Sequence, residues 1–105
     1  MKRILLTALI AMTVSSPVLA EKVTKAIGDV DCGRWIKDTG NMKSLNTIWL
    51  VGFMTGLNFG DAQMRNSLEK VSVQQIFLWM DNFCKANPLK TISYGGYELM
   101  DELRK

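Results

Sequence analysis

Carboxylates are the candidates for acid–base catalysis in this sequence, because the 105 residues include no histidine that could act as a general base. Paired carboxylates hydrolyse glycosides, and the candidates for such a pair are Asp61, Glu69 and Asp81. Acidic side chains are mostly solvated surface groups, which is the simpler interpretation of these three. The sequence also lacks the Gly-x-Ser-x-Gly turn of hydrolases and the Lys-Ser/Thr ending of a phosphate-binding loop. We therefore expect a protein that is not an enzyme and needs no cofactor or metal.

Residues 1–20 have the layout of a secretory signal peptide. A short basic start precedes an apolar run over residues 4–13, and small residues lead up to Ala20. The run is shorter than the roughly 20 residues that a membrane-spanning helix needs. Glu21 follows instead of the cysteine of a lipoprotein. We expect cleavage after Ala20 and a periplasmic mature protein, residues 21–105, that forms one domain without membrane insertion.

The two cysteines, Cys32 and Cys84, are predicted to form a structural disulfide. An even pair of cysteines in an oxidising compartment is typical of a disulfide. The alternatives are a redox pair, which would usually be Cys-x-x-Cys, and half of a metal site, which would need more ligands. The disulfide would close a loop of about 50 residues, which stabilises the fold by about 4 kcal/mol in the chain-entropy model.

The charge of the mature chain gives no reason to expect a nucleic-acid partner. Lys2 and Arg3 leave with the signal peptide, so the formal charge falls from +3 to +1. Nucleic-acid binding rests on a clustered positive surface. The longest run of like charge in the mature chain is a pair, as at Arg104 and Lys105. Proteins are the remaining class of partner that we expect.

The most apolar stretch of the mature chain, residues 47–60, predicts a central helix with Ser44 as its N-cap. Gly52, Gly56 and Gly60 recur every fourth residue, which places them on one face of such a helix. Each glycine costs a helix roughly 1 kcal/mol relative to alanine. Close packing of a neighbouring helix would offset that cost. We therefore predict that these three glycines form a helix-packing face.

Shorter helices are predicted on both sides of the central one. Asp31 can cap a short helix that carries the first cysteine, and residues 21–30 form a loose lead-in. Ser72-x-x-Gln75 is a capping-box pattern that opens a helix ending at Asn87. Pro88 suits the first turn of a last helix. The apolar stripe of that helix is Leu89, Ile92, Gly96, Leu99, Met100 and Leu103.

No segment alternates apolar and polar residues as a strand would, so the predicted fold is all-α. We expect a small orthogonal bundle of four to five helices, stapled by the Cys32–Cys84 disulfide. The bundle is rich in aromatic residues and methionine, most of which we assign to the core. Phe59, Phe77 and Trp79 are the candidates for a protein-binding surface, because aromatic residues concentrate in binding hot spots.

The mature chain resembles the small periplasmic proteins of the HdeA/HdeB type. The matching segments are residues 32–35 (Cys-Gly-Arg-Trp), the apolar glycine helix at residues 49–58, and residues 83–88 around the second cysteine. The resemblance implies an all-helical fold with a Cys32–Cys84 disulfide. It also implies an acid-stress chaperone that is a folded homodimer near neutral pH, loosens in acid and holds unfolded client proteins. A second resemblance, to periplasmic immunity proteins of the Rap1a/Tai type, implies binding to one specific protein partner.

The charged side chains of the mature chain are compatible with loosening in acid. Its ten carboxylates have ordinary pKa values of about 4. Their protonation leaves eleven Lys and Arg side chains and the amino terminus, a charge of about +12. This self-repulsion would loosen the helices while a disulfide holds them together. The absence of histidine argues against a switch near pH 6.

Overall fold

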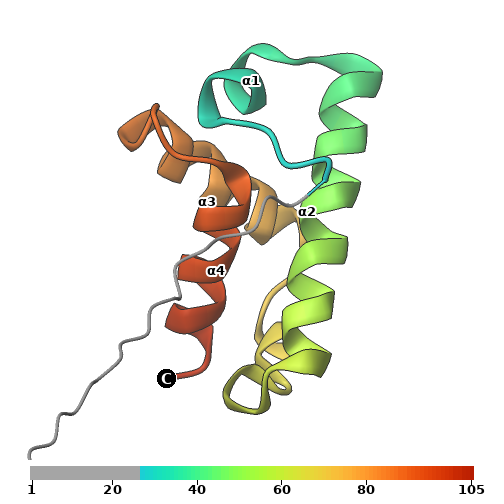
Figure 1. Ribbon diagram of the computed structural model, residues 1–105, viewed down its shortest axis with the longest axis vertical. Helices are drawn as coiled ribbons and strands as arrows, with labels where there is room; N and C mark the ends of the chain where they lie inside the picture. Colours follow the sequence, from blue (N-terminus) through green and yellow to red (C-terminus); the bar gives the residue numbers. More distant parts are fainter. Residues whose placement is uncertain (1–26) are drawn as a thin grey trace, which may run out of the picture.

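The computed structural model describes residues 27–105 as a bundle of four α-helices (Figure 1). These are α1 (Cys32–Lys37), α2 (Gly40–Gly60), α3 (Val73–Ala86) and α4 (Ile92–Leu103), with the 3₁₀ turns η1 (Ala62–Met64) and η2 (Ser67–Lys70) between α2 and α3. No strand occurs in residues 27–105, where the only pairing of that kind is an isolated bridge between Asp31 and Thr91. The all-α prediction is confirmed, whereas the predicted signal peptide, residues 1–20, lies outside the described residues.

Two of the predicted helix starts are confirmed. The side chain of Asp31 accepts a 2.7 Å hydrogen bond from the backbone N–H of Arg34, which caps α1. Ser72 and Gln75 form the complete capping box at the start of α3, with bonds of 2.8 and 3.2 Å. Both caps join residues three apart in the chain, so short-range spacing was sufficient to predict them.

The predicted starts of α2 and α4 are wrong. α2 begins at Gly40 with Thr39 as its N-cap, five residues before the predicted cap Ser44. Its first turns are tied to the end of α1, because the amide of Asn46 donates a 2.9 Å hydrogen bond to the Asp38 carboxylate. α4 begins at Ile92, so Pro88 lies in the preceding turn and not in the helix.

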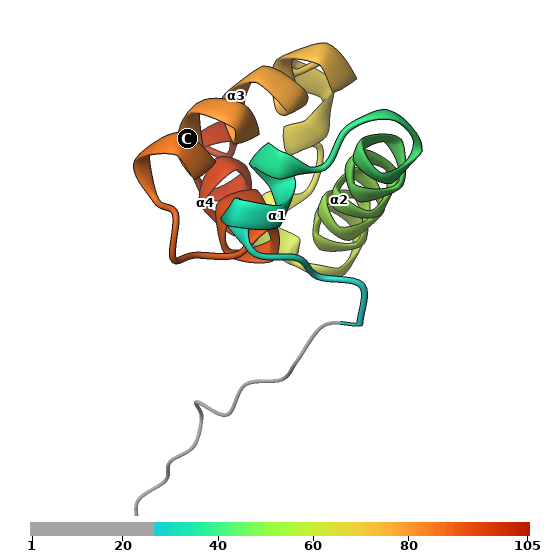
Figure 2. The ribbon, with the colours of Figure 1, turned by 90° about the horizontal axis from the view of Figure 1, so that it is seen from above.

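The disulfide between Cys32 and Cys84 is confirmed and joins α1 to α3, with the two Cα atoms 4.8 Å apart. α2 and α4 run side by side in the same direction, and α3 is inclined to this pair (Figures 1 and 2). The predicted all-α bundle with one disulfide is therefore the observed fold. The staple fastens the two helices that precede and follow α2 in the sequence.

The loose lead-in predicted for residues 21–30 is wrong for residues 27–30, and its first part, residues 21–26, lies outside the described residues. The backbone carbonyl of Ile27 accepts a 2.7 Å hydrogen bond from the indole of Trp49 on α2. The carboxylate of Asp29 accepts two bonds from Ser93 on α4, at 3.0 Å from its backbone N–H and 2.5 Å from its hydroxyl. The segment therefore links α2 to the start of α4.

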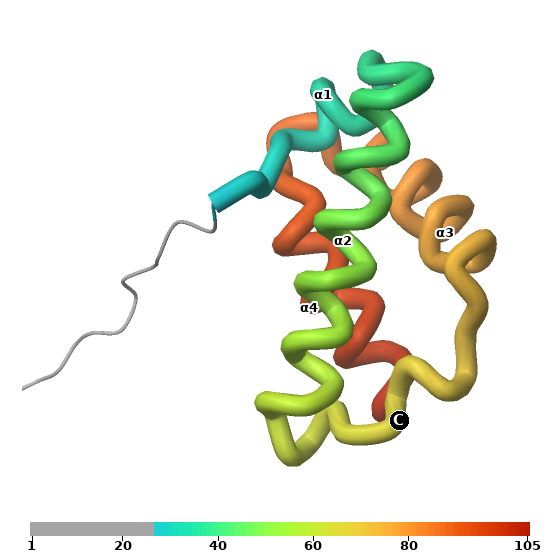
Figure 3. The backbone as a smooth tube through the Cα atoms, turned by 90° about the vertical axis from the view of Figure 1, so that its right-hand side faces the viewer, coloured from blue at the N-terminus to red at the C-terminus, as the bar shows by residue number. Residues whose placement is uncertain are grey.

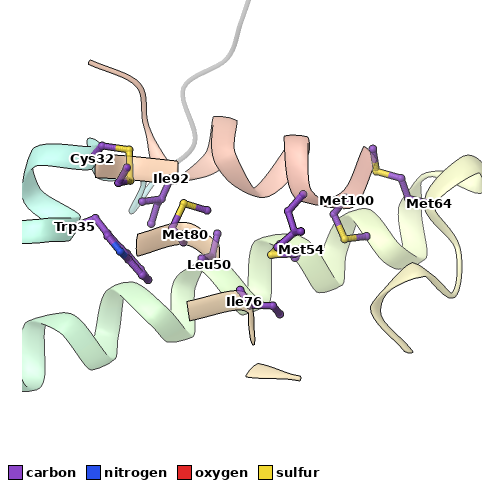
Figure 4. Close-up of a cluster of buried hydrophobic side chains, with 11 residues drawn as sticks. Cys32, Trp35, Leu50, Met54, Met64, Ile76, Met80, Ile92 and Met100 are labelled. Atoms are coloured by element: carbon purple, nitrogen blue, oxygen red, sulfur yellow. A yellow bond between two sulfur atoms is a disulfide. The ribbon is translucent and has the colours of Figure 1, made fainter. Parts of the chain in front are cut away.

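Methionine supplies much of the buried core (Figure 4). Met54 of α2 and Met100 of α4 are fully buried between these helices, and Met80 of α3 is fully buried beside the disulfide end of the bundle. Met64 comes from η1, in the connection between α2 and α3. Methionine is flexible and fills irregular gaps, so this core depends on adaptable side chains. The remaining buried hydrophobic residues are Cys32, Trp35, Leu50, Ile76, Cys84, Ile92 and Leu99.

The glycines that pack helices together lie on α4. A Cβ atom added at Gly95 would stand 2.7 Å from the sulfur of Met80 and 2.8 Å from the ring of Phe83. One added at Gly96 would stand 3.1 Å from Leu50 on α2. These two positions therefore let α3 and α2 approach α4 closely. The rest of the predicted α4 stripe turns inward, apart from Leu89, which is 95% exposed in the turn before the helix.

The prediction that Gly52, Gly56 and Gly60 form the packing face of α2 is wrong. All three are exposed, and no atom of the described residues other than their own helix turn lies within 4 Å of an added Cβ. The face of α2 that packs carries Asn46, Leu50 and Met54. Both faces of this helix are apolar, so periodicity alone did not distinguish the packed face from the exposed one.

Among residues 27–105, no helix combines the length and apolar character needed to cross a membrane.

Candidate protein-binding surface

Asp81 lies in a polar cluster that joins three helices. Its carboxylate accepts a 3.1 Å hydrogen bond from the indole of Trp35 and lies 3.9 Å from the amines of Lys43 and Lys85. Lys43 also donates to the backbone carbonyl of Trp35 and stands 4.7 Å from the centre of its ring. The cluster therefore connects α1, α2 and α3, and it gives Asp81 a structural role.

The two other acids considered for catalysis lie in the connection between α2 and α3. The carboxylate of Asp61 accepts a 2.9 Å hydrogen bond from the backbone N–H of Gln63 and caps η1. Glu69 is exposed on η2. No pocket is found within the part of the chain that the structure describes. That the protein is not an enzyme stays a prediction.

The three aromatic residues predicted to bind protein do not form one patch. Phe77 is half-buried beside Trp35 with ring centres 5.5 Å apart, so it belongs to the edge of the core. Trp79 is half-buried and stacks on Phe83 at 5.2 Å. Phe59 is 74% exposed near the end of α2. Of the three, Phe59 is the one most available to a partner.

Phe59 belongs to an exposed apolar face of α2. Leu45 is 57% exposed and Ile48 is 67% exposed, and both lie on the same side of the helix as Phe59 at heptad-like spacing. Gly52 and Gly56 lie between them along this side. We call these five residues the α2 outer face. In Figure 3, α2 lies at the front of the molecule with α4 behind it.

The α2 outer face carries no charge. Lys43 is the single charged residue between Gly40 and Gly60, and it turns toward Asp81 and Trp35 with 16% of its side chain exposed. Exposed helix faces of globular proteins are normally charged or polar. Contiguous apolar patches on a protein surface often mark interaction sites. Leu45 and Ile48 were missed as surface residues, although the lack of charge along α2 was visible in the sequence.

The pKa of Asp38, at the junction of α1 and α2, is lowered. The hydrogen bond from Asn46 lowers the pKa of Asp38 below its ordinary value of 3.8, and the nearby guanidinium of Arg34 lowers it further. Desolvation of the carboxyl opposes these two effects without cancelling them. Asp38 therefore keeps its charge, and its bond to α2, to lower pH than an isolated aspartate.

The geometry thus defines a disulfide-clamped helical bundle with one uncharged apolar helix face on its surface. Comparison of the chain with protein-family models, with curated proteins and with solved structures finds no match. The resemblance to HdeA/HdeB-type and Rap1a/Tai-type proteins therefore stays a prediction.

Proposed function

We propose that this protein is a periplasmic, non-enzymatic binding protein, an acid-stress holdase of the HdeA type that holds unfolded client proteins. The observation that carries the proposal is the α2 outer face. Unfolded proteins expose apolar side chains, and an apolar surface without charge can bind many such sequences without electrostatic selection. Leu45, Ile48 and Phe59 are the residues that would contact a client.

In acid, apolar surface beyond the α2 outer face becomes exposed, for two reasons. Protonation of the carboxylates brings the mature chain to a charge of about +12, which favours an expanded state. The core gives way readily, because Met54, Met80 and Met100 fill it with flexible side chains. The Cys32–Cys84 disulfide limits the expansion by keeping α1 joined to α3. Further apolar surface then becomes available to clients while the chain stays connected.

Light scattering of an aggregating model client at pH 2–3 tests the proposal. The mature protein at a several-fold molar excess is expected to suppress aggregation. Phe59→Ser and Ile48→Ser should weaken suppression, since they remove apolar contacts and stay uncharged at this pH. Leu78→Ser is the matched control, because Leu78 is 60% exposed but lies on α3, away from the α2 outer face. Absence of suppression by the unmodified protein would rule out a holdase.

The second candidate is an immunity protein or inhibitor that binds one protein partner. It is favoured by one observation: the α2 outer face is already exposed in the folded bundle, so binding requires no acid loosening. A pull-down from periplasmic extract at neutral pH should then recover one partner in a fixed ratio. Recovery of no partner, together with aggregation suppression at pH 2–3, would reject this candidate in favour of the holdase.

A further inference from the structure

Residues 27–29, which we call the strap, lie between the side of α2 and the start of α4 (Figure 1). Three hydrogen bonds hold the strap in this position. The carbonyl of Ile27 accepts one from the Trp49 indole, and the Asp29 carboxylate accepts two from Ser93. The disulfide joins α1 to α3, so the strap ties together two helices that the disulfide leaves unconnected.

Gly28 brings the strap into direct contact with the ring of Trp49. Its φ angle of +91° lies in the left-handed region, which favours glycine. A Cβ added at Gly28 would stand 2.5 Å from Nε1 and 2.6 Å from Cδ1 of Trp49. A residue without a side chain is therefore required where the strap crosses the edge of this indole. The strap covers that edge of the half-buried ring.

Trp49 continues the α2 outer face toward α4. Helical spacing places it one turn after Leu45 and one turn before Gly52. Its ring stacks on that of Phe53, with centres 5.3 Å apart and planes at 7°. Phe53 in turn faces α4, where a Cβ added at Gly96 would stand 3.3 Å from its ring. The strap thus covers the edge of an aromatic pair that adjoins the α2 outer face.

The strap has few contacts besides its three hydrogen bonds. Ile27 is 93% exposed and Gly28 has no side chain, so the strap buries no apolar side chain of its own. The next residue is fixed, because Val30 packs against the core and its carbonyl accepts a 2.9 Å bond from the backbone N–H of Ile92. Segments with few buried apolar contacts open at a lower free-energy cost than the core. The strap can therefore lift by itself, with its hinge just before Val30.

We propose that the strap is an autoinhibitory cover. When residues 27–29 lift from Trp49 and Ser93, the Trp49–Phe53 pair joins the α2 outer face in one larger apolar surface. This inference rests on the proposed function, because the ligand of the larger surface is an apolar segment of an unfolded protein. A client that contacts the uncovered pair shifts the population toward the open strap by the free energy of those extra contacts. Opening takes place in the folded bundle and requires no acid.

Hydrogen exchange of the folded protein near neutral pH tests the cover without a client. The Ser93 amide and the Trp49 indole N–H both donate to the strap, so they should exchange whenever it lifts. The Ile92 amide and the Trp35 indole N–H, which bond elsewhere, are the internal references. Faster exchange of the two strap-bonded groups is expected. Equal rates for all four groups would mean that the strap opens only with the whole bundle, and would overturn the proposal.

Two variants should open the strap by different means. Asp29→Ala removes both bonds to Ser93 and should speed exchange of the Trp49 indole by about tenfold. Gly28→Ala should act in the same direction, because its methyl group meets the edge of the indole. Neither substitution alters the α2 outer face itself.

Each variant has a matched control. Gly40→Ala introduces a side chain at another positive φ, +57°, but its methyl group meets open space. Asp101→Ala removes one carboxylate from α4, as Asp29→Ala removes one from the strap, but the bond it loses is to Arg104. Both controls should leave exchange of the Trp49 indole unchanged. Equal effects of variants and controls would assign the exchange to general loss of stability and overturn the cover.

Dye binding and aggregation suppression at pH 7 separate this proposal from the proposed function. Asp29→Ala and Gly28→Ala should bind more anilinonaphthalene sulfonate than the unmodified protein, with unchanged helical circular dichroism, and should suppress aggregation of a model client better than their controls. Suppression at pH 2–3 by the unmodified protein, with neither dye binding nor exchange altered in the variants, would overturn the cover and retain the holdase. Increased dye binding and exchange without suppression at either pH would support the opening and reject the holdase.

Discussion

Two sets of glycines in this molecule have opposite surroundings. On α4, Gly95 and Gly96 are buried, and added Cβ atoms would stand 2.7 Å from Met80 and 3.1 Å from Leu50. On α2, Gly52 and Gly56 are exposed and an added Cβ would meet open space. The α4 glycines are adjacent in the sequence, whereas the α2 glycines have the four-residue spacing associated with helix packing. Spacing therefore identifies a shared face but not what lies against it.

The difference separates the part of the molecule that maintains the fold from the part available for binding. The α4 glycines allow three helices to pack around the methionine core. The α2 glycines contribute nothing to packing within the described bundle, and they weaken α2 by roughly 1 kcal/mol each relative to alanine. A helix that keeps such residues on an uncharged face retains a surface that suits close contact with another molecule.

The largest expected loss of stability comes from removing the disulfide that joins α1 to α3. The double variant Cys32→Ser/Cys84→Ser should lose about 4 kcal/mol of unfolding free energy, because the unfolded chain regains the entropy of an open loop. Urea unfolding at pH 7 measures this loss. A loss below about 1 kcal/mol would mean that the noncovalent core alone holds α1 on α3.

Gly95→Ala should cause the next largest loss of unfolding free energy. Its methyl group would meet the sulfur of Met80 and the ring of Phe83, and overpacking of this kind costs about 1–3 kcal/mol. The gain in helix propensity offsets only part of that cost. A lower urea midpoint than that of the unmodified protein is therefore expected. An unchanged or higher midpoint would show that Met80 moves aside and that α4 is not closely packed here.

Gly52→Ala should change the unfolding free energy in the opposite direction and stabilise the fold. Alanine at this exposed helix position should raise the unfolding free energy by up to about 1 kcal/mol. Gly56→Ala should give a similar gain, since its surroundings are equally open. A loss at either position would place those glycines against another part of the chain and remove the contrast with Gly95.

The smallest expected effect concerns pH and the junction of α1 with α2. Because the folded pKa of Asp38 lies below its ordinary value of 3.8, the charged carboxylate stabilises the fold above that pH. This contribution is lost as the pH falls through the lowered folded pKa. Asp38→Asn should therefore have a slightly lower urea midpoint at pH 6, and the difference should disappear in stronger acid. A difference that persists at pH 2 would contradict an electrostatic origin.

The local features of the fold were predictable from the sequence. Asp31 and the Ser72–Gln75 pair cap their helices within one turn, so residue type and spacing determine those starts. The disulfide followed from the even pair of cysteines together with the predicted export of the chain. The start of α2 was not predictable in this way, because it depends on the contact of Asn46 with Asp38 from the preceding helix.

The exposed face of α2 was not predictable, because both sides of the helix are apolar. Leu50 and Met54 are buried while Leu45 and Ile48 are exposed, and nothing in their chemistry separates the two pairs. The choice depends on α4, where Gly96 admits Leu50 from the facing helix. The burial of Phe77 was not predictable from its own helix either, because it depends on contact with Trp35 of α1.

The most direct test of the account is the urea midpoint at pH 7 of Gly52→Ala and of Gly95→Ala, each compared with the unmodified protein. Gly52→Ala should raise the midpoint, because alanine is a better helix former than glycine and its methyl group meets open space. Gly95→Ala should lower the midpoint, because its methyl group meets Met80 and Phe83. Shifts of the same sign in the two variants would contradict the account.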